Sequence, residues 1–203
     1  TRSVSLAGCP SLVGMNAAGL SIGTTNVKTW RARPGVGYMN ILHRMLEEPN
    51  AEAAIAVVEQ APRSGAHIYW ACDTTEGIEI EAIPDQSERR SVANGPLCRT
   101  NHCLQPEHLP LQWEAPSPSS LARLERLQER VAAGGVSTSE VVAMFADRSD
   151  GVDSVCRYEE DDQGTATNAC MVAIPQDRLL LVCRGPADRG EWQTLAFDSA
   201  DPR

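Results

Sequence analysis

Hydrophobic and polar positions follow two different periods along this chain. Over residues 38–48 apolar side chains recur every three or four positions, which is typical of one helix face, and Pro49 ends the pattern. Asn50 is a favourable helix cap in front of a second segment with an apolar face, which ends before Pro62. This part of the sequence therefore predicts two consecutive helices.

Two further helices are predicted in the second half of the chain. The Ser-Pro pair at 117–118 is a good helix start, and the leucine stripe that follows it stops at the glycine pair 134–135. Ser137 and Glu140 have the spacing of a capping box, in which each side chain bonds the backbone of the other residue. The proline-rich residues 105–118 are expected to form an exposed loop.

Strand patterns fill most of the remaining sequence. The run IEIEAI (78–83) alternates apolar with acidic residues, and TTEG (74–77) separates it from the run AHIYWACD (66–73), which predicts an antiparallel hairpin. Residues 7–19 form a turn-rich connection. Further strands are expected at residues 4–6, 19–26, 168–175, 178–185 and 192–197.

The order of these elements predicts an α+β fold. Strands, helices, strands, helices and strands follow one another in blocks, whereas a parallel sheet needs a regular alternation of strand and helix. The pattern favours antiparallel sheets with helices packed outside them. The sequence contains no internal repeat and no interdomain linker, so we expect residues 1–203 to form a single domain.

Composition narrows the classes of function and partner. The formal net charge of −9 argues against nucleic acid or an anionic membrane surface as a partner, because both attract basic surfaces. No apolar run reaches the roughly 18 residues of a membrane span. Seven cysteines spread over 203 residues do not resemble the framework of a disulfide-rich secreted protein, which favours the cytoplasm.

The segment CRTNHC (98–103) is the densest group of reactive side chains, and it has several interpretations. As a metal site it lacks a fourth ligand, and His102 and Cys103 point apart in an extended chain. A disulfide between Cys98 and Cys103 is disfavoured by a reducing compartment. We expect neither a metal nor a cofactor. Taken alone, Asn101 is a turn residue and Arg157, in the polar stretch 153–160, belongs to a surface ion pair.

Four segments in order resemble a known family. VGMNAAGLSIGTTN (13–26), residues 33–62, RTNHC (99–103) and SVCRYEE (154–160) are together similar to the acyl-coenzyme A:6-aminopenicillanic acid acyltransferase family. Its members are autoproteolytic N-terminal-nucleophile (Ntn) hydrolases. The resemblance implies a four-layer αββα sandwich, with two antiparallel sheets between helical layers, and an enzyme that acts on a small-molecule amide or acyl substrate.

The resemblance also implies roles for individual residues. Asn101 matches an asparagine whose amide donates to the oxyanion, and Asn26 matches a second donor. Arg157 matches an arginine that acts electrostatically on the surroundings of the nucleophile. Two positions depart from the family pattern, since Arg99 replaces a histidine and Gly37 replaces a proline.

The nucleophile is not found among the matching segments. In the family a cysteine exposed by self-cleavage, with its own α-amino group as base, lies upstream of the segment that matches residues 7–16. We therefore expect an enzyme piece that carries the oxyanion side, accompanied by a small N-terminal chain. Two alternatives stay open, namely Thr1 as a processed N-terminal nucleophile and a non-catalytic scaffold or partner-binding subunit with the same fold.

Overall fold

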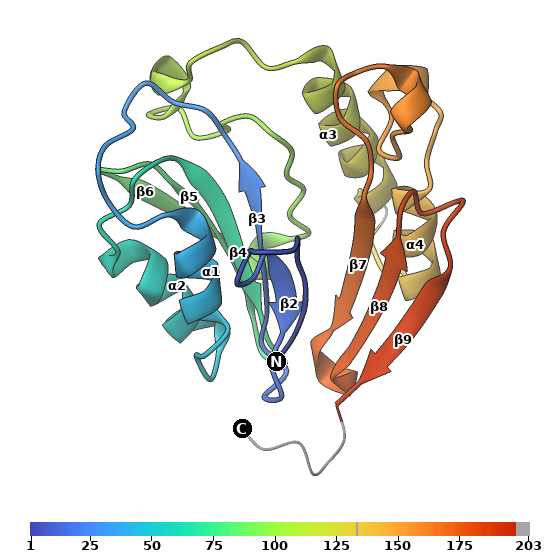
Figure 1. The fold of residues 1–203 in the computed structure, drawn as a ribbon, viewed down its shortest axis with the longest axis horizontal. Coiled ribbons are helices and arrows are strands. Elements are labelled where there is room, and N and C mark those ends of the chain that lie inside the picture. Colours follow the sequence, from blue (N-terminus) through green and yellow to red (C-terminus); the bar gives the residue numbers. More distant parts are fainter. Residues whose placement is uncertain (133, 198–203) are drawn as a thin grey trace.

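The chain folds into four layers, helices outside and two antiparallel sheets inside (Figure 1). The computed structural model describes residues 1–132 and 134–197. The larger sheet has the strand order β1-β2-β3-β4-β5-β6 and the smaller one β7-β8-β9. This is the predicted αββα arrangement. The strands are Arg2–Val4 (β1), Val13–Met15 (β2), Ser21–Asn26 (β3), His67–Cys72 (β4), Gly77–Ala82 (β5), Ser87–Ser91 (β6), Ala169–Ile174 (β7), Leu179–Arg184 (β8) and Trp192–Ala196 (β9).

The helices α1 (Tyr38–Met45) and α2 (Ala51–Gln60) cover the outer face of the larger sheet. The Asn50 side chain accepts a hydrogen bond from the N–H of Ala53, as a cap does, and confirms the predicted start of α2. The apolar faces of both helices pack on alternate residues of the strands, including Ile22, Tyr69 and Ile80. Burial of these side chains is the main source of stability in this half of the molecule.

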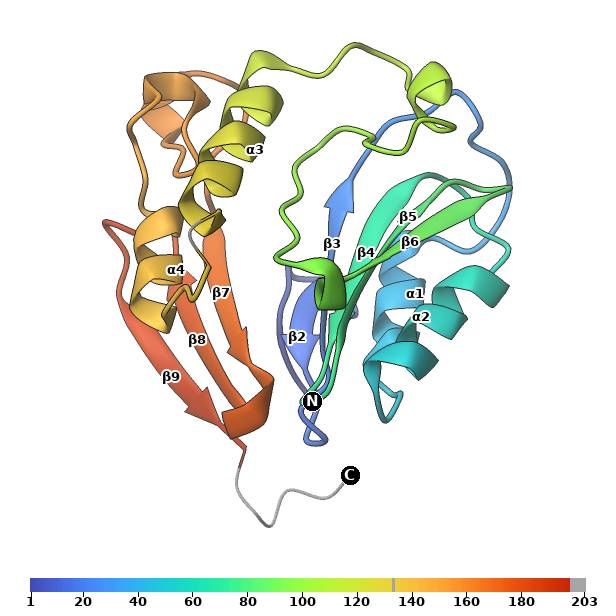
Figure 2. The same cartoon turned by 180° about the vertical axis from the view of Figure 1, so that it is seen from behind.

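The helices α3 (Pro118–Val131) and α4 (Thr138–Phe145) form the layer on the far side, beyond the smaller sheet (Figure 2). Ser117 caps α3, and the capping box of Ser137 and Glu140 begins α4, both as predicted. Between the two sheets, Met15, Leu180 and Phe197 form a small apolar cluster. None of the helices in the described part of the chain is long and apolar enough to cross a bilayer.

Three strands and one loop differ from the sequence-based expectations. The first strand, expected at residues 4–6, spans Arg2–Val4. The connection 7–19 contains β2, whose three residues are too few to show an alternation. The edge strand β6 has the polar sequence SERRS and carries no apolar period. The loop 105–118 is not exposed throughout, because His108 is completely buried against the larger sheet. The sequence pattern missed β2 because the strand is short, and β6 because an edge strand can be polar. It missed the burial of His108 because that depends on tertiary contacts.

Candidate functional site

The segment around Asn101 meets the end of β3. Asn101 Nδ2 donates to the backbone carbonyl of Asn26 at 3.2 Å, and both residues are solvent-exposed. The structure thus brings together two residues that lie 75 positions apart in the sequence. The contact uses the Asn26 carbonyl, so the Asn26 carboxamide, the predicted second oxyanion donor, has no part in it.

The first turn of α3 fixes the backbone of the same segment. Ser120 Oγ accepts a hydrogen bond from the Asn101 N–H at 2.9 Å, and Thr100 Oγ1 donates to the Ser120 carbonyl at 2.8 Å. His102 Nδ1 lies 2.8 Å from Ser120 Oγ. Burial, and then the charge of Arg99, lower the pKa of His102, so a neutral ring faces Ser120 at neutral pH. His102, whose role the sequence leaves open, here anchors the segment.

Arg123, one turn further along α3, binds the Asn101 side chain. A terminal nitrogen of its guanidinium donates to Asn101 Oδ1 at 3.0 Å, while its Nε donates to the carbonyl and the hydroxyl of Ser119 at 3.1 and 3.2 Å. Sequence reasoning did not single out Arg123. Its only signal was that of a charge on the polar side of an amphipathic helix, which is usually a solvated position.

Arg157 lies close enough to act on this cluster electrostatically. Burial, and then the Arg157 charge, lower the pKa of Arg123. The backbone of Arg157 is held by Thr167 through two hydrogen bonds of 3.0 Å. Its side-chain Nε is buried and has no hydrogen-bond partner in the described structure. The predicted site residues Asn26, Asn101 and Arg157 therefore share one region of the molecule.

Thr1 lies at the other end of the larger sheet. Arg2, its neighbour, pairs with Met15, which in turn pairs with Ser21 at the start of β3, whereas Asn26 ends that strand. A strand rises about 3.3 Å per residue, so roughly 17 Å of strand separate the two levels. The structure does not bring Thr1 to Asn101.

The two cysteines of the segment 98–103 are chemically quiet. All seven cysteines of the chain are unpaired. Cys103 is completely buried, and burial together with the nearby Glu81 carboxylate raises its pKa to about 12. Burial also raises the pKa of Cys98. Neither thiol forms the reactive thiolate readily at neutral pH.

Buried ion pairs join the segment 98–103 to strand β5. Arg99 binds Glu79 through two nitrogens at 2.5 and 3.0 Å and reaches Glu81 at 2.7 Å. Glu81 also receives the N–H of Leu104 at 2.9 Å and lies 2.9 Å from His108 Nδ1. The acidic residues of IEIEAI thus form a buried face of β5. Arg99, the arginine that departs from the family pattern, neutralises this face together with Arg90.

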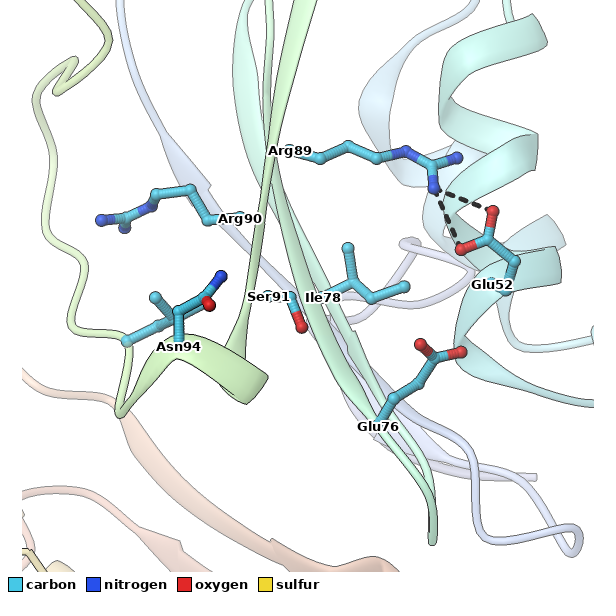
Figure 3. A pocket seen from close by; sticks show the side chains of 8 residues that line it. Glu52, Glu76, Ile78, Arg89, Arg90, Ser91 and Asn94 are labelled. Carbon is cyan, nitrogen blue, oxygen red and sulfur yellow. Dashed lines mark hydrogen bonds and ion pairs between the residues drawn. The ribbon is translucent and has the colours of Figure 1, made fainter.

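A hollow of about 500 Å³ lies elsewhere, beside the edge strand β6 (Figure 3). Arg89 and Arg90 leave this strand on opposite sides, and Arg89 binds Glu52 of α2 at 2.8 Å. Glu79 binds Arg90 at 2.9 Å. Within the lining Arg89 pairs with Glu52, whereas Arg90 pairs with Glu79, which lies outside it. The lining includes none of the predicted site residues.

Comparisons with known proteins identify the family and the fold. The sequence model of the acyl-coenzyme A:6-aminopenicillanic acid acyl-transferase family matches residues 5–188. Among solved structures, penicillin V acylase from Agrobacterium tumefaciens is similar in fold, with a TM-score of 0.63 and 15% sequence identity over 94% of this chain and 67% of that chain. A search of curated protein sequences found no significant match.

Proposed function

Because the chain belongs to the acyl-coenzyme A:6-aminopenicillanic acid acyl-transferase family, we propose that it serves as an amide-bond hydrolase or acyltransferase with Asn101 as an oxyanion donor. The observation that carries the proposal is the exposed Asn101 carboxamide, held by two partners. An amide nitrogen has two hydrogens, and the Asn26 carbonyl takes one of them. The other N–H is free for the oxygen of a substrate.

The proposed reaction uses an N-terminal thiol from outside residues 1–203. The α-amino group takes the thiol proton as the sulfur adds to the carbonyl carbon of the substrate. The substrate oxygen, on which negative charge develops, accepts a hydrogen bond from the free N–H of Asn101. The C–N bond then breaks, and the amine leaves with a proton delivered by the α-amino group of the nucleophile. Water or an amine acceptor finally cleaves the thioester. Self-cleavage by the same thiol leaves a small companion chain.

Four features of the chain support this choice of nucleophile and setting. Thr1 lies at the wrong end of the larger sheet, and the thiols of Cys98 and Cys103 have raised pKa values. The acidic net charge of −9 supports a small-molecule substrate in preference to a nucleic-acid or membrane partner. The seven unpaired cysteines support a cytoplasmic location.

Asn101→Ala in the full-length protein tests the proposal. We expect kcat for release of amine from N-acyl substrates, such as penicillin V and N-acyl amino acids, to fall about 100-fold with little change in melting temperature. Asn40→Ala, at an exposed asparagine of α1, is the matched control and leaves kcat unchanged. An unchanged kcat in Asn101→Ala removes Asn101 from the reaction.

The same preparation separates the enzyme from the scaffold alternative. Mass spectrometry of the purified protein identifies its true amino terminus and any companion chain. We expect a cysteine at the amino terminus of the mature enzyme. If the full-length protein neither cleaves itself nor turns over any amide or acyl substrate, it is a non-catalytic scaffold.

A further inference from the structure

The side chain of Asn101 is held between two partners of opposite hydrogen-bonding type. Arginine only donates, so the atom of Asn101 that faces Arg123 must be the carbonyl oxygen. A backbone carbonyl only accepts, so the atom that faces Asn26 must be the amide nitrogen. The two contacts demand the same orientation of the carboxamide, which is therefore fixed without ambiguity.

Arg123 is itself fixed by its own helix. Its Nε is held by the carbonyl and hydroxyl of Ser119, and Ser119 is buried. The neighbouring Ser120 holds the backbone N–H of Asn101. The start of α3 therefore sets both the backbone and the side-chain orientation of this one asparagine.

The charge of Arg123 is not cancelled by a carboxylate. No ion pair within 4.0 Å involves Arg123 among the residues that the structure describes. Burial, and then the charge of the nearby Arg157, lower the pKa of Arg123, and the Asp153 carboxylate offsets this only in part. Arginine stays protonated at neutral pH all the same. A cation at the carboxamide oxygen draws electron density away from the nitrogen, which makes the remaining N–H a stronger donor.

We infer that Arg123 is a positioning residue for the oxyanion donor, acting on the reaction only through the Asn101 carboxamide. The inference rests on the proposed function. It identifies the group that aims the free N–H at the substrate oxygen and polarises it. Loss of Arg123 then weakens binding of the transition state more than binding of the substrate, so kcat falls while KM changes little.

A double-mutant cycle in the full-length protein tests this. We expect Arg123→Met to lower kcat by at least about 10-fold, and to have no further effect once Asn101 is alanine, because its route of action is gone. Arg123→Lys keeps the charge but not the forked donor, so its kcat should lie between those of wild type and Arg123→Met. Arg126→Met, on the same helix, is the matched control and should retain the wild-type kcat.

The outcomes separate this inference from the proposed function. If Asn101→Ala has normal kcat, the proposed function fails and the inference fails with it. Two outcomes, each with a lowered kcat in Asn101→Ala, overturn the inference alone. In the first, Arg123→Met has the wild-type kcat. In the second, Arg123→Met lowers kcat by the same factor in the Asn101→Ala background as in the wild type. Should Arg123→Met not fold, the cycle is run with Arg123→Lys, whose smaller loss must likewise vanish beside Asn101→Ala.

Discussion

Two pairs of arginines lie near the segment Cys98–Cys103 and differ in what neutralises them. Arg90 and Arg99 bind the buried carboxylates of Glu79 and Glu81, so two positive charges meet two negative ones. Arg123 and Arg157 form no such pair within the described structure, and the first contacts a carboxamide instead. Arginine thus stabilises the buried carboxylates of β5 in one place and makes the surroundings of Asn101 electropositive in the other.

Charge is divided between stability and chemistry in these two pairs of arginines. A buried guanidinium that is cancelled by a carboxylate exerts little field beyond its partner. One whose charge is not cancelled acts on whatever polar group lies next to it, which here is Asn101. The contrast predicts that substitutions in the first pair lower stability and those in the second lower turnover.

Arg99→Met should have the largest effect on stability. It leaves Glu81, whose side chain is 0% exposed, without its guanidinium, and Glu79, which is 5% exposed, with Arg90 alone. Breaking a buried pair in this way costs about 3–5 kcal/mol of unfolding free energy. Urea denaturation of the full-length protein measures it. Arg44→Met, at an exposed ion pair of α1, is the control. A loss below about 1 kcal/mol for Arg99→Met contradicts the supporting role.

Arg157→Lys should act on turnover or on self-cleavage. We expect kcat, or the rate of maturation, to fall on the order of 10-fold, because a planar forked donor is replaced by a point charge. The melting temperature should change little, since Thr167 holds the backbone of residue 157 through atoms that the substitution leaves in place. Kinetic assays and mass spectrometry of the mature chain follow both steps. Normal maturation and normal turnover reduce Arg157 to a packing role.

Arg126→Met should have the smallest effect of the series. Arg126 lies on α3 three residues after Arg123, but it binds Asp150 at 2.9 Å near the surface. We expect a melting temperature within about 2 °C of wild type. Calorimetry measures it, with the wild-type protein as reference. A drop in stability comparable to that of Arg99→Met would show that any charge on α3 matters, and the contrast between the arginine pairs would collapse.

The local sequence determined the helices and the main hairpin. The caps at Asn50, Ser117 and Ser137 act within three residues of their own position, so the chain alone specifies where these helices start. The alternation in residues 78–83 likewise predicted a strand. The family motifs singled out Asn26, Asn101 and Arg157, and their roles stay predictions. The structure brings Asn101 into contact with Asn26.

Which charges are buried, and what they contact, depends on how the layers pack. In the sequence the acidic residues of β5 form an ordinary polar face. In the structure Arg99, Arg90 and His108 cover this face. The pairing of Arg123 with Asn101 joins residues 22 positions apart on a helix and a loop. Hydrogen bonds and ion pairs of this kind depend on distances between elements. A local pattern sets the elements, and packing of the layers sets the distances.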